Sequence, residues 1–312
     1  SHWTGRFGNR MHQYAFGATY SRINNVQFTL CSDWEGTILF ANLPHFLFPD
    51  DGLRVRMNQI RNRHREKYRE EVIRQYEERM GIGLHYLRPD VDDAPYLHYD
   101  YSYYNGLCAY NSKIFSAMSK EHLREIFSFS DEVKELPIFK KLADIQGTYD
   151  VAHLRRDDIS NPGAAKCGYS VLSIDSYKRA FEKYGFDADC IQWVSDDYTN
   201  QWANKLGFNV NRDRLGWSYP LGSNYSPEVV FDWLEDFLKL YFARTIFRAN
   251  SSFSWWAGML SPTAKVFSPR LSERRLYNDE SLEELDVQFE EGNHPHWVNL
   301  QGSKCPDITI PE

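Results

Sequence analysis

Two adjacent arginines follow an apolar run near the middle of the chain, in the segment YDVAHLRRDD at residues 149–158. If this run is a strand, successive side chains point to opposite faces, so His153 and Arg155 share one face while Arg156 lies on the other. Two guanidinium groups at a strand end suit a diphosphate, because they stay charged and their N–H groups match phosphate oxygens. The alternative interpretation is a salt-bridge cluster with the two aspartates that follow, at a domain seam.

A polar turn precedes an aromatic segment in TIFRANSSFSWWAGML, residues 245–260. Asn and Ser are typical N-cap residues, and the first turn of a helix presents unpaired N–H groups to an anion. Asn250, Ser251 and Ser252 are therefore candidates for binding a phosphate. The alternative is a well-capped buried helix in which Phe253 and the two tryptophans belong to the core.

Paired carboxylates end a third segment, WVSDD at residues 193–197. Carboxylates at the end of a strand, here Asp196 and Asp197, can accept from ribose hydroxyls or base N–H groups. They also suit the cap of a following helix, so both interpretations stay open.

Glycines mark the segment GRFGN at residues 5–9, ahead of a helix predicted from residue 11 by its apolar spacing. Alternation over residues 26–30 predicts a strand after that helix. A glycine-rich loop lets the backbone approach a ligand closely, but a short Gly-x-x-Gly is a weak signal alone.

Two Asp-x-Asp pairs have a spacing that suits a divalent metal. Asp90 and Asp92 form the first pair, and Asp187 and Asp189 form the second. Neither pair ends an apolar strand, and the five cysteines are widely spaced without a Cys-x-x-Cys motif. We therefore expect no metal site.

Composition narrows the classes of partner. The 312-residue chain has a formal net charge of −7, which leaves little positive field to attract nucleic acid. No apolar stretch approaches the ~18 uninterrupted residues of a membrane-spanning helix. Because no signal peptide is visible and the cysteines are odd in number, we expect a cytoplasmic protein or the soluble catalytic portion of a longer one.

The pattern of elements changes near residue 149, where strands begin to alternate with helices. This alternation predicts an α/β fold with a parallel, doubly wound sheet. A strand is also expected before Gly5, upstream of this chain. The tyrosine-rich segment 96–110 suits either a strand or stacking on the sugar rings of an acceptor. The predicted helices are 120–146, 174–183, 199–206 and 227–243, and the predicted strands are 149–155, 190–194 and 245–248.

Four motifs, in order along the chain, resemble those of the α-1,2-fucosyltransferase family. GRFGNRMHQYAFG at 5–17 is similar to the family's G-R-L-G-N-Q-M-F-Q-Y-A, and HLRRDD at 153–158 is similar to H-x-R-R-x-D. WVSDD at 193–197 resembles F-S-D-D, and ANSSFSWWAGML at 249–260 nearly repeats N-S-S-F-S-W-W. Four such motifs in order make the resemblance specific.

The resemblance implies a GT-B-like fold of two Rossmann-like, doubly wound domains facing across a donor cleft. Residues 1–148 are then the acceptor-side domain, and residues 149–312 bind the GDP-sugar. The implied reaction is an inverting, metal-independent transfer of L-fucose from GDP-β-L-fucose to a hydroxyl of an oligosaccharide or glycan, forming an α1,2 linkage. GDP-fucose is a substrate of this reaction, and no cofactor is expected.

Residue roles also follow from the resemblance. Arg155 and Arg156 are assigned to the donor phosphates, where charge develops as the sugar leaves. His153 and Asp158 are the candidates for a base that activates the acceptor hydroxyl.

Asp236 and Asp197 are assigned to guanosine, and Asp236 lies fifteen residues before Ser251, where the family also has an Asp. The remaining donor-binding candidates are Gly8, Asn9, Arg10, Ser195, Asn250, Ser251, Ser252 and Phe253.

Two other functions are compatible with the sequence. One is a catalytically silent sugar- or nucleotide-binding module of the same fold. Such a module is expected to have lost the arginine pair, whereas both arginines are present here. A metal-dependent transferase that uses another nucleotide-sugar is the second, with Asp90 and Asp92 as ligands, and treatment with EDTA would separate it.

Overall fold

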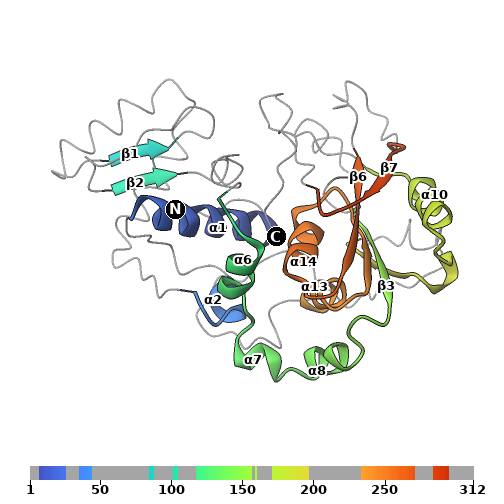
Figure 1. Cartoon of the computed structure of the whole chain (residues 1–312), viewed down its shortest axis with the longest axis horizontal. Helices are drawn as coiled ribbons and strands as arrows, with labels where there is room; N and C mark the ends of the chain where they lie inside the picture. The colour runs from blue at the N-terminus through green and yellow to red at the C-terminus, as the bar shows by residue number, and fades with distance from the viewer. Residues whose placement is uncertain are drawn as a thin grey trace. The chain divides into compact units, whose positions relative to one another are not determined.

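The structure is a computed structural model that describes residues 7–25, 35–43, 84–87, 101–104, 117–156, 159, 171–196, 233–270 and 284–294. The chain forms two compact units, one of residues 1–128 with 310–312 and one of residues 129–309. Their elements are labelled in Figure 1. The division at 128/129 falls ahead of the boundary at 148/149 that the sequence pattern predicts.

Helix α1 (Phe7–Asn24) begins earlier than the sequence pattern predicts. Phe7 is buried and stacks on Phe40 with ring centroids 6.2 Å apart, so burial of this ring extends the helix toward the N-terminus. Gly8 and Asn9 therefore lie within the first turn of the helix and not in a loop before it. The strand predicted over residues 26–30 lies outside the described residues.

Short elements make up the rest of the described first unit. Helix α2 (Gly36–Leu39) precedes Phe40, whose ring meets Phe127 edge-on at 5.1 Å. Strands β1 (Leu84–Leu87) and β2 (Tyr101–Tyr104) pair in parallel. For its four residues, β2 agrees with the strand interpretation of the tyrosine-rich segment.

The helix predicted over residues 120–146 is three helices: α6 (Lys120–Ile126), α7 (Asp131–Lys134) and α8 (Pro137–Asp144). Ser130 begins α7 because its side chain accepts the N–H of Val133 at 3.3 Å. Pro137 begins α8, at the position where the missing N–H of proline costs nothing.

The second unit contains a five-stranded sheet with the strand order β4-β3-β5-β6-β7. The first four strands are parallel and β7 is antiparallel to β6, which confirms the predicted α/β class with a parallel sheet. The sequence pattern predicts three of these strands and misses β6 and β7. The bounds are β3 (Asp150–Leu154), β4 (Gln192–Ser195), β5 (Thr245–Phe247), β6 (Lys265–Arg270) and β7 (Gln288–Glu291).

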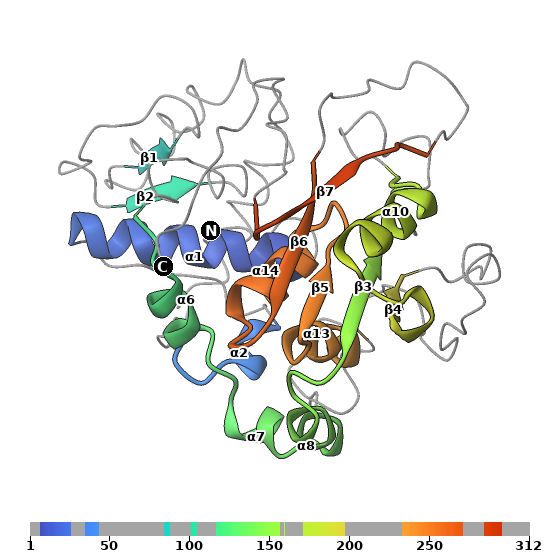
Figure 2. The ribbon, with the colours of Figure 1, turned by 45° about the vertical axis from the view of Figure 1, so that its right-hand side comes forward.

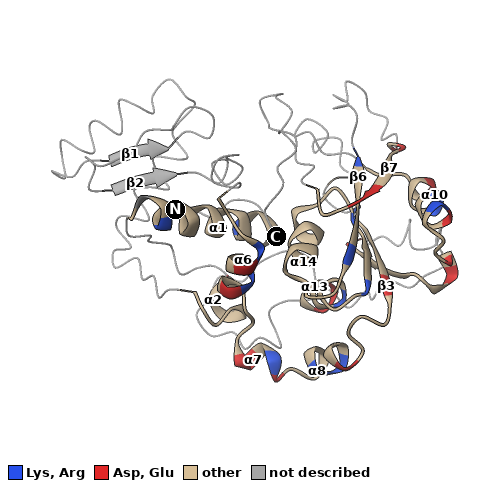
Figure 3. Cartoon of the chain, in the orientation of Figure 1, with Lys and Arg blue, Asp and Glu red and all other residues tan. Residues whose placement is uncertain are grey.

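Helices cover both faces of the sheet, with α10 (Ile174–Tyr184) on one face and α13 (Leu234–Tyr241) and α14 (Ser252–Leu260) on the other, as Figure 2 shows. α10 carries charges of both signs, whereas α14 carries none and is drawn in a single colour in Figure 3. α14 is buried from Ser254 onward, as expected for a helix that is apolar on all sides. None of the helices in the described part of the chain has the length and apolar character needed to cross a membrane.

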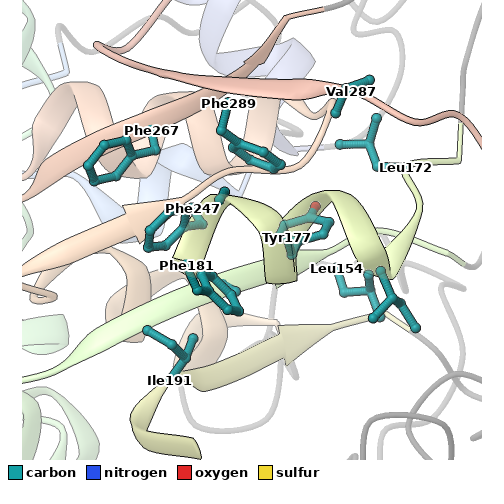
Figure 4. Close-up of a cluster of buried hydrophobic side chains, with 12 residues drawn as sticks. Leu154, Leu172, Tyr177, Phe181, Ile191, Phe247, Phe267, Val287 and Phe289 are labelled. Atoms are coloured by element: carbon teal, nitrogen blue, oxygen red, sulfur yellow. The ribbon is translucent and has the colours of Figure 1, made fainter. Parts of the chain in front are cut away.

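The core between α10 and the sheet combines aliphatic side chains with several aromatic rings (Figure 4). Phe247 of β5 stacks on Phe267 of β6 at 4.7 Å, and Phe181 of α10 meets Phe247 edge-on at the same centroid distance. Ala152 and Leu154 of β3 face this core. The opposite face of β3 therefore meets α13 and α14, and the predicted alternation of β3 is confirmed.

The path of the chain creates a topological switch point. From β3 the chain passes to β4 on one side, and then to β5 on the other side of β3. In open parallel sheets, ligands bind where two neighbouring strands lead away in opposite directions, beyond their carboxyl ends. The ends of β3 and β5 are therefore the place to look for a site.

Candidate functional site

Arg155 connects the two strand ends at the switch point. It directly follows β3, it is half-buried, and its Nη1 donates to the carbonyl oxygen of Asn250 at 3.2 Å. Asn250 belongs to the turn between β5 and α14. The hydrogen bond therefore brings a guanidinium group to the N-terminal end of α14.

Ser251 is the N-cap of α14. Its Oγ accepts the N–H of Phe253 at 3.2 Å, and its carbonyl oxygen accepts the N–H of Trp255 at 3.2 Å. The first N–H groups of a helix lack intrahelical partners and carry the positive end of the helix dipole. An anion at this end would meet the positive end of the helix dipole and the guanidinium group of Arg155, so the arrangement suits a phosphate group.

Arg156 has a different environment, because it is 1% exposed. Its Nη1 donates to the carbonyl oxygen of Arg155 at 3.0 Å, and its Nη2 donates to that of Leu172 at 2.6 Å. Its backbone N–H donates to Oδ1 of Asp196 at 2.6 Å. Arg156 thus joins the end of β3 to the segment that leads into α10.

His153 lies next to the arginines and is buried, and its ring contacts that of Phe253 at 5.7 Å. Burial, together with the positive charges of three arginines of which Arg155 acts most strongly, lowers the pKa of His153 to about 3. Among the residues that the structure describes, Nδ1 of this ring has no hydrogen-bond partner. The imidazole is therefore neutral at neutral pH and is a weak base.

Arg248 is a residue of this edge that the motifs do not identify. It directly follows β5, as Arg155 follows β3, and it is completely buried. Its Nη1 donates to Oδ1 of Asn293 at 2.5 Å. Burial lowers the pKa of Arg248 to about 9, so the side chain is still charged at neutral pH. The one feature of the sequence that could have identified Arg248 is its position directly after an apolar strand.

Asp236 is buried in the first turn of α13. Two aromatic neighbours, Trp233 and Phe237, contact the ring of Phe253 at 6.0 and 5.3 Å. These contacts pack the first turn of α13 against the first turn of α14. Asp236 therefore lies in a helix turn that packs against the N-terminal end of α14.

The other predicted residues of the second unit are only partly described. Ser195 is buried at the end of β4 and pairs in register with Leu154 of β3. Ser252 is half-buried in the first turn of α14. Asp158 and Asp197 lie outside the described residues.

The three predicted residues of the first unit, Gly8, Asn9 and Arg10, lie in the first turns of α1. Gly8 is buried, and Asn9 and Arg10 are half-buried. Nη1 of Arg10 forms an ion pair with Oε2 of Glu35 at 2.6 Å. Burial raises the pKa of Glu35, and the charge of Arg10 opposes this effect.

The Asp-x-Asp pairs do not form a described metal site. Asp187 caps the short helix η4 (Ala188–Cys190), since its Oδ1 accepts the N–H of Asp189 at 3.1 Å. Asp90 and Asp92 lie outside the described residues. Across the described ranges, no three His, Cys, Asp or Glu side chains gather as a metal site would require.

The second unit is thus an α/β unit with a candidate anion site at the carboxyl edge of a parallel sheet. No protein-family model matches the chain, and no curated protein matches it. Among solved structures, the chain is similar to an arginine-to-lysine mutant of FUT1 from Arabidopsis thaliana in complex with GDP. That match has a TM-score of 0.44 and 11% identity, and it covers 92% of this chain and 72% of FUT1.

A second similar structure is that of NodZ, an α-1,6-fucosyltransferase soaked with GDP-fucose. The TM-score is 0.43 at 14% identity, over 91% of this chain and 95% of NodZ.

Proposed function

We propose that the protein transfers L-fucose from GDP-fucose to a hydroxyl group of a glycan acceptor. The main support is the hydrogen bond from Arg155 to Asn250, which joins two segments 95 residues apart. One segment resembles the H-x-R-R-x-D motif and the other resembles the N-S-S-F-S-W-W motif of α-1,2-fucosyltransferases. Motifs that matched by chance would have no reason to meet at the switch point of a sheet.

The chemistry of the transfer suits the groups at this edge. The acceptor oxygen forms a bond to the anomeric carbon of fucose while the bond from that carbon to the phosphate oxygen breaks. GDP leaves with the electron pair, and the acceptor hydroxyl loses its proton. Negative charge therefore grows on the diphosphate, where Arg155 and the first N–H groups of α14 stabilise it.

The finer parts of the proposal are inversion at the anomeric carbon, an α1,2 linkage, and transfer without a metal. A fixed guanidinium group and helix N–H groups supply the positive charge that a divalent cation would otherwise supply to the leaving group. Asp158 is the better candidate for the acceptor base, because the low pKa of His153 makes its ring a weak one.

We also propose a two-domain, GT-B-like arrangement in which residues 149–312 bind the GDP-sugar and residues 1–148 bind the acceptor. Arg155, Asp236 and Ser251 all belong to the donor-binding part. Hydrogen exchange with and without GDP tests this assignment, since the strongest protection should fall after residue 149. Protection concentrated before that residue would contradict it.

A donor and acceptor screen tests the reaction. We expect turnover with GDP-fucose over a panel of free glycans, no turnover with UDP-sugars, and an α1,2 linkage in the product by NMR. Activity should survive EDTA. Turnover only with another nucleotide-sugar, or its loss with EDTA, would favour the metal-dependent alternative, and binding of GDP without turnover on any acceptor would favour the silent binding module.

A further inference from the structure

Asn293, two residues after β7, connects the end of β5 to α14. Its Oδ1 accepts from Nη1 of Arg248 at 2.5 Å, and its Nδ2 donates to the carbonyl oxygen of Trp255 at 3.0 Å. The indole Nε1 of Trp255 donates in turn to the backbone carbonyl oxygen of Asn293 at 3.2 Å. Three hydrogen bonds thus hold one residue between a buried arginine and a buried helix.

These partners require an amide at this position. A guanidinium group can only donate, and a carbonyl oxygen can only accept, so the side chain between them must accept at one end and donate at the other. The orientation of the Asn293 amide follows from this requirement. A carboxylate would direct an oxygen at the carbonyl oxygen of Trp255 and would add a negative charge beside Arg248.

The surroundings of Asn293 are shaped to hold it. A Cβ atom at Gly258 of α14 would lie 3.4 Å from Oδ1 of Asn293 and 3.0 Å from Cγ2 of Val266. The helix can therefore approach Asn293 and Val266 closely because this residue is glycine. On the other side, Gly292 has a φ of 122°, and a Cβ atom there would lie 2.5 Å from Nε2 of His294. The turn that presents Asn293 therefore requires glycine.

The first turn of α14 and the two strand ends meet through this network. Trp255 also donates its backbone N–H to the carbonyl oxygen of Ser251, the N-cap residue. The hydroxyl of Tyr177, in α10, donates to the carbonyl oxygen of His153 at 2.8 Å. The same hydroxyl lies 3.5 Å from the carbonyl oxygen of Arg248. A shift of Asn293 would therefore reach both Arg248 and the turn that carries Asn250.

We propose that Asn293 is a positioning residue of the anion site. It fixes the guanidinium group of Arg248 and, through Trp255, the first turn of α14, whose preceding turn Arg155 reaches at Asn250. Because its amide is neutral, Asn293 holds Arg248 without adding negative charge to a site that binds a diphosphate. The positioned groups need not move when the anion binds, and preorganisation of this kind is a main source of electrostatic stabilisation. This inference rests on the proposed function, because the diphosphate is the anion that the site would bind.

The test compares three variants: Asn293→Asp, Asn293→Ala and Ser268→Ala. Ser268 is the matched control, since its Oγ holds the same turn through the carbonyl oxygen of Gly292 and the N–H of His294, and neither of these hydrogen bonds involves Arg248 or Trp255. GDP and inorganic pyrophosphate are titrated into the full chain by calorimetry, and the melting temperature of each variant is recorded.

We expect Asn293→Asp to weaken the binding of pyrophosphate about tenfold or more, a change of roughly 1.4 kcal/mol. Asn293→Ala should weaken it less, and Ser268→Ala should bind like the wild type even where it melts as early as the Asn293 variants. If Asn293 served stability alone, Asn293→Asp and Asn293→Ala variants of equal melting temperature would bind pyrophosphate equally well. Equal affinities for all three variants and the wild type would overturn the inference.

A measurement without ligand keeps the inference falsifiable if the Asn293 variants fold poorly. Trp255→Phe retains an aromatic ring but removes the N–H that Asn293 accepts, and it should speed amide hydrogen exchange in the first turn of α14 relative to α10. Unchanged exchange there would overturn the inference while the proposed function stands. If the wild type binds neither GDP nor pyrophosphate, the proposed function fails and this inference fails with it.

Discussion

Nη1 of Arg156 donates to the backbone carbonyl oxygen of Arg155 at 3.0 Å, so one arginine of the pair supports the backbone of the other. Arg156 is completely buried on the side of α10, whereas Arg155 is half-buried and reaches the turn before α14. Adjacent residues of the same type therefore have different tasks. Under the proposed function, Arg155 meets the diphosphate, and Arg156 holds the strand end that carries Arg155.

Replacing Arg155 tests the first task. We expect Arg155→Ala to lower kcat with GDP-fucose by about 10²–10³, as loss of one donor to a developing negative charge typically does. Arg155→Lys should recover little of the activity, because an ammonium group lacks the planar fork of N–H groups. Steady-state kinetics with both variants measures the effect.

The melting curve is the control for Arg155. Arg155 is only half-buried, so its loss should cost little stability, and the melting temperature of Arg155→Ala should stay near that of the wild type. If the variant keeps a near-wild-type kcat, the role of Arg155 at the phosphates is wrong.

Replacing Arg156 tests the second task. Arg156→Ala removes the donors to the part-buried carbonyl oxygen of Arg155 and the buried one of Leu172, and it opens a cavity at a side-chain position that is 1% exposed. We expect a loss of about 3 kcal/mol or more in the free energy of unfolding, measured by urea denaturation. A variant as stable as the wild type, with turnover reduced as in Arg155→Ala, would assign Arg156 to the phosphates instead.

Local patterns predict the part of the fold that carries the candidate site. The apolar runs of β3 and β5 are visible in the sequence, and so is Ser173, which caps α10 by accepting the N–H of Ser176 at 3.1 Å. The missed strands lack such signals. β6 contains Pro269, which cannot donate to a neighbouring strand, and Phe289 is the only buried residue of β7. Their place in the sheet is given by pairing with a neighbour, β6 with β5 and β7 with β6.

The candidate site was predictable to a similar degree. Arg155 belongs to a recognisable pair, and Ser251 has the composition of an N-cap. Arg248 looks like any single arginine after a strand, and Asn293, to which its guanidinium group donates, follows it by 45 residues. Such long-range partners become visible only when the chain is folded.

Replacing Asp236 tests the recognition of guanine. If its carboxylate accepts from N1–H and the N2 amino group of guanine, UDP leaves a buried charge without those partners, at a cost of about 1–3 kcal/mol or more. We expect the wild type to bind GDP well above UDP in calorimetry, and Asp236→Ala to remove most of the difference.

The adjacent residue supplies the control for Asp236. Glu235 is also in the first turn of α13, but it pairs with Lys239 at 2.7 Å and its side chain is 42% exposed. Glu235→Ala should therefore keep the preference for GDP. Equal affinity of the wild type for GDP and UDP would refute the assignment of Asp236.

The low pKa of His153 makes a prediction about stability and pH. Folding lowers this pKa to about 3, whereas a histidine in an unfolded chain has a pKa of about 6.5. Between these values the unfolded chain binds a proton that the folded chain does not, so the free energy of unfolding falls as the pH falls. Between about pH 7 and about pH 5, we expect the free energy of unfolding of the wild type to fall by on the order of 1–2 kcal/mol more than that of His153→Gln. Urea denaturation at both pH values measures this loss, with His294→Gln, which replaces a half-buried ring, as the control.

NMR measures the titration of the His153 ring directly. The ring should not titrate between pH 7 and pH 5, and a titration midpoint near the ordinary histidine pKa would show that the ring is available as a base at neutral pH.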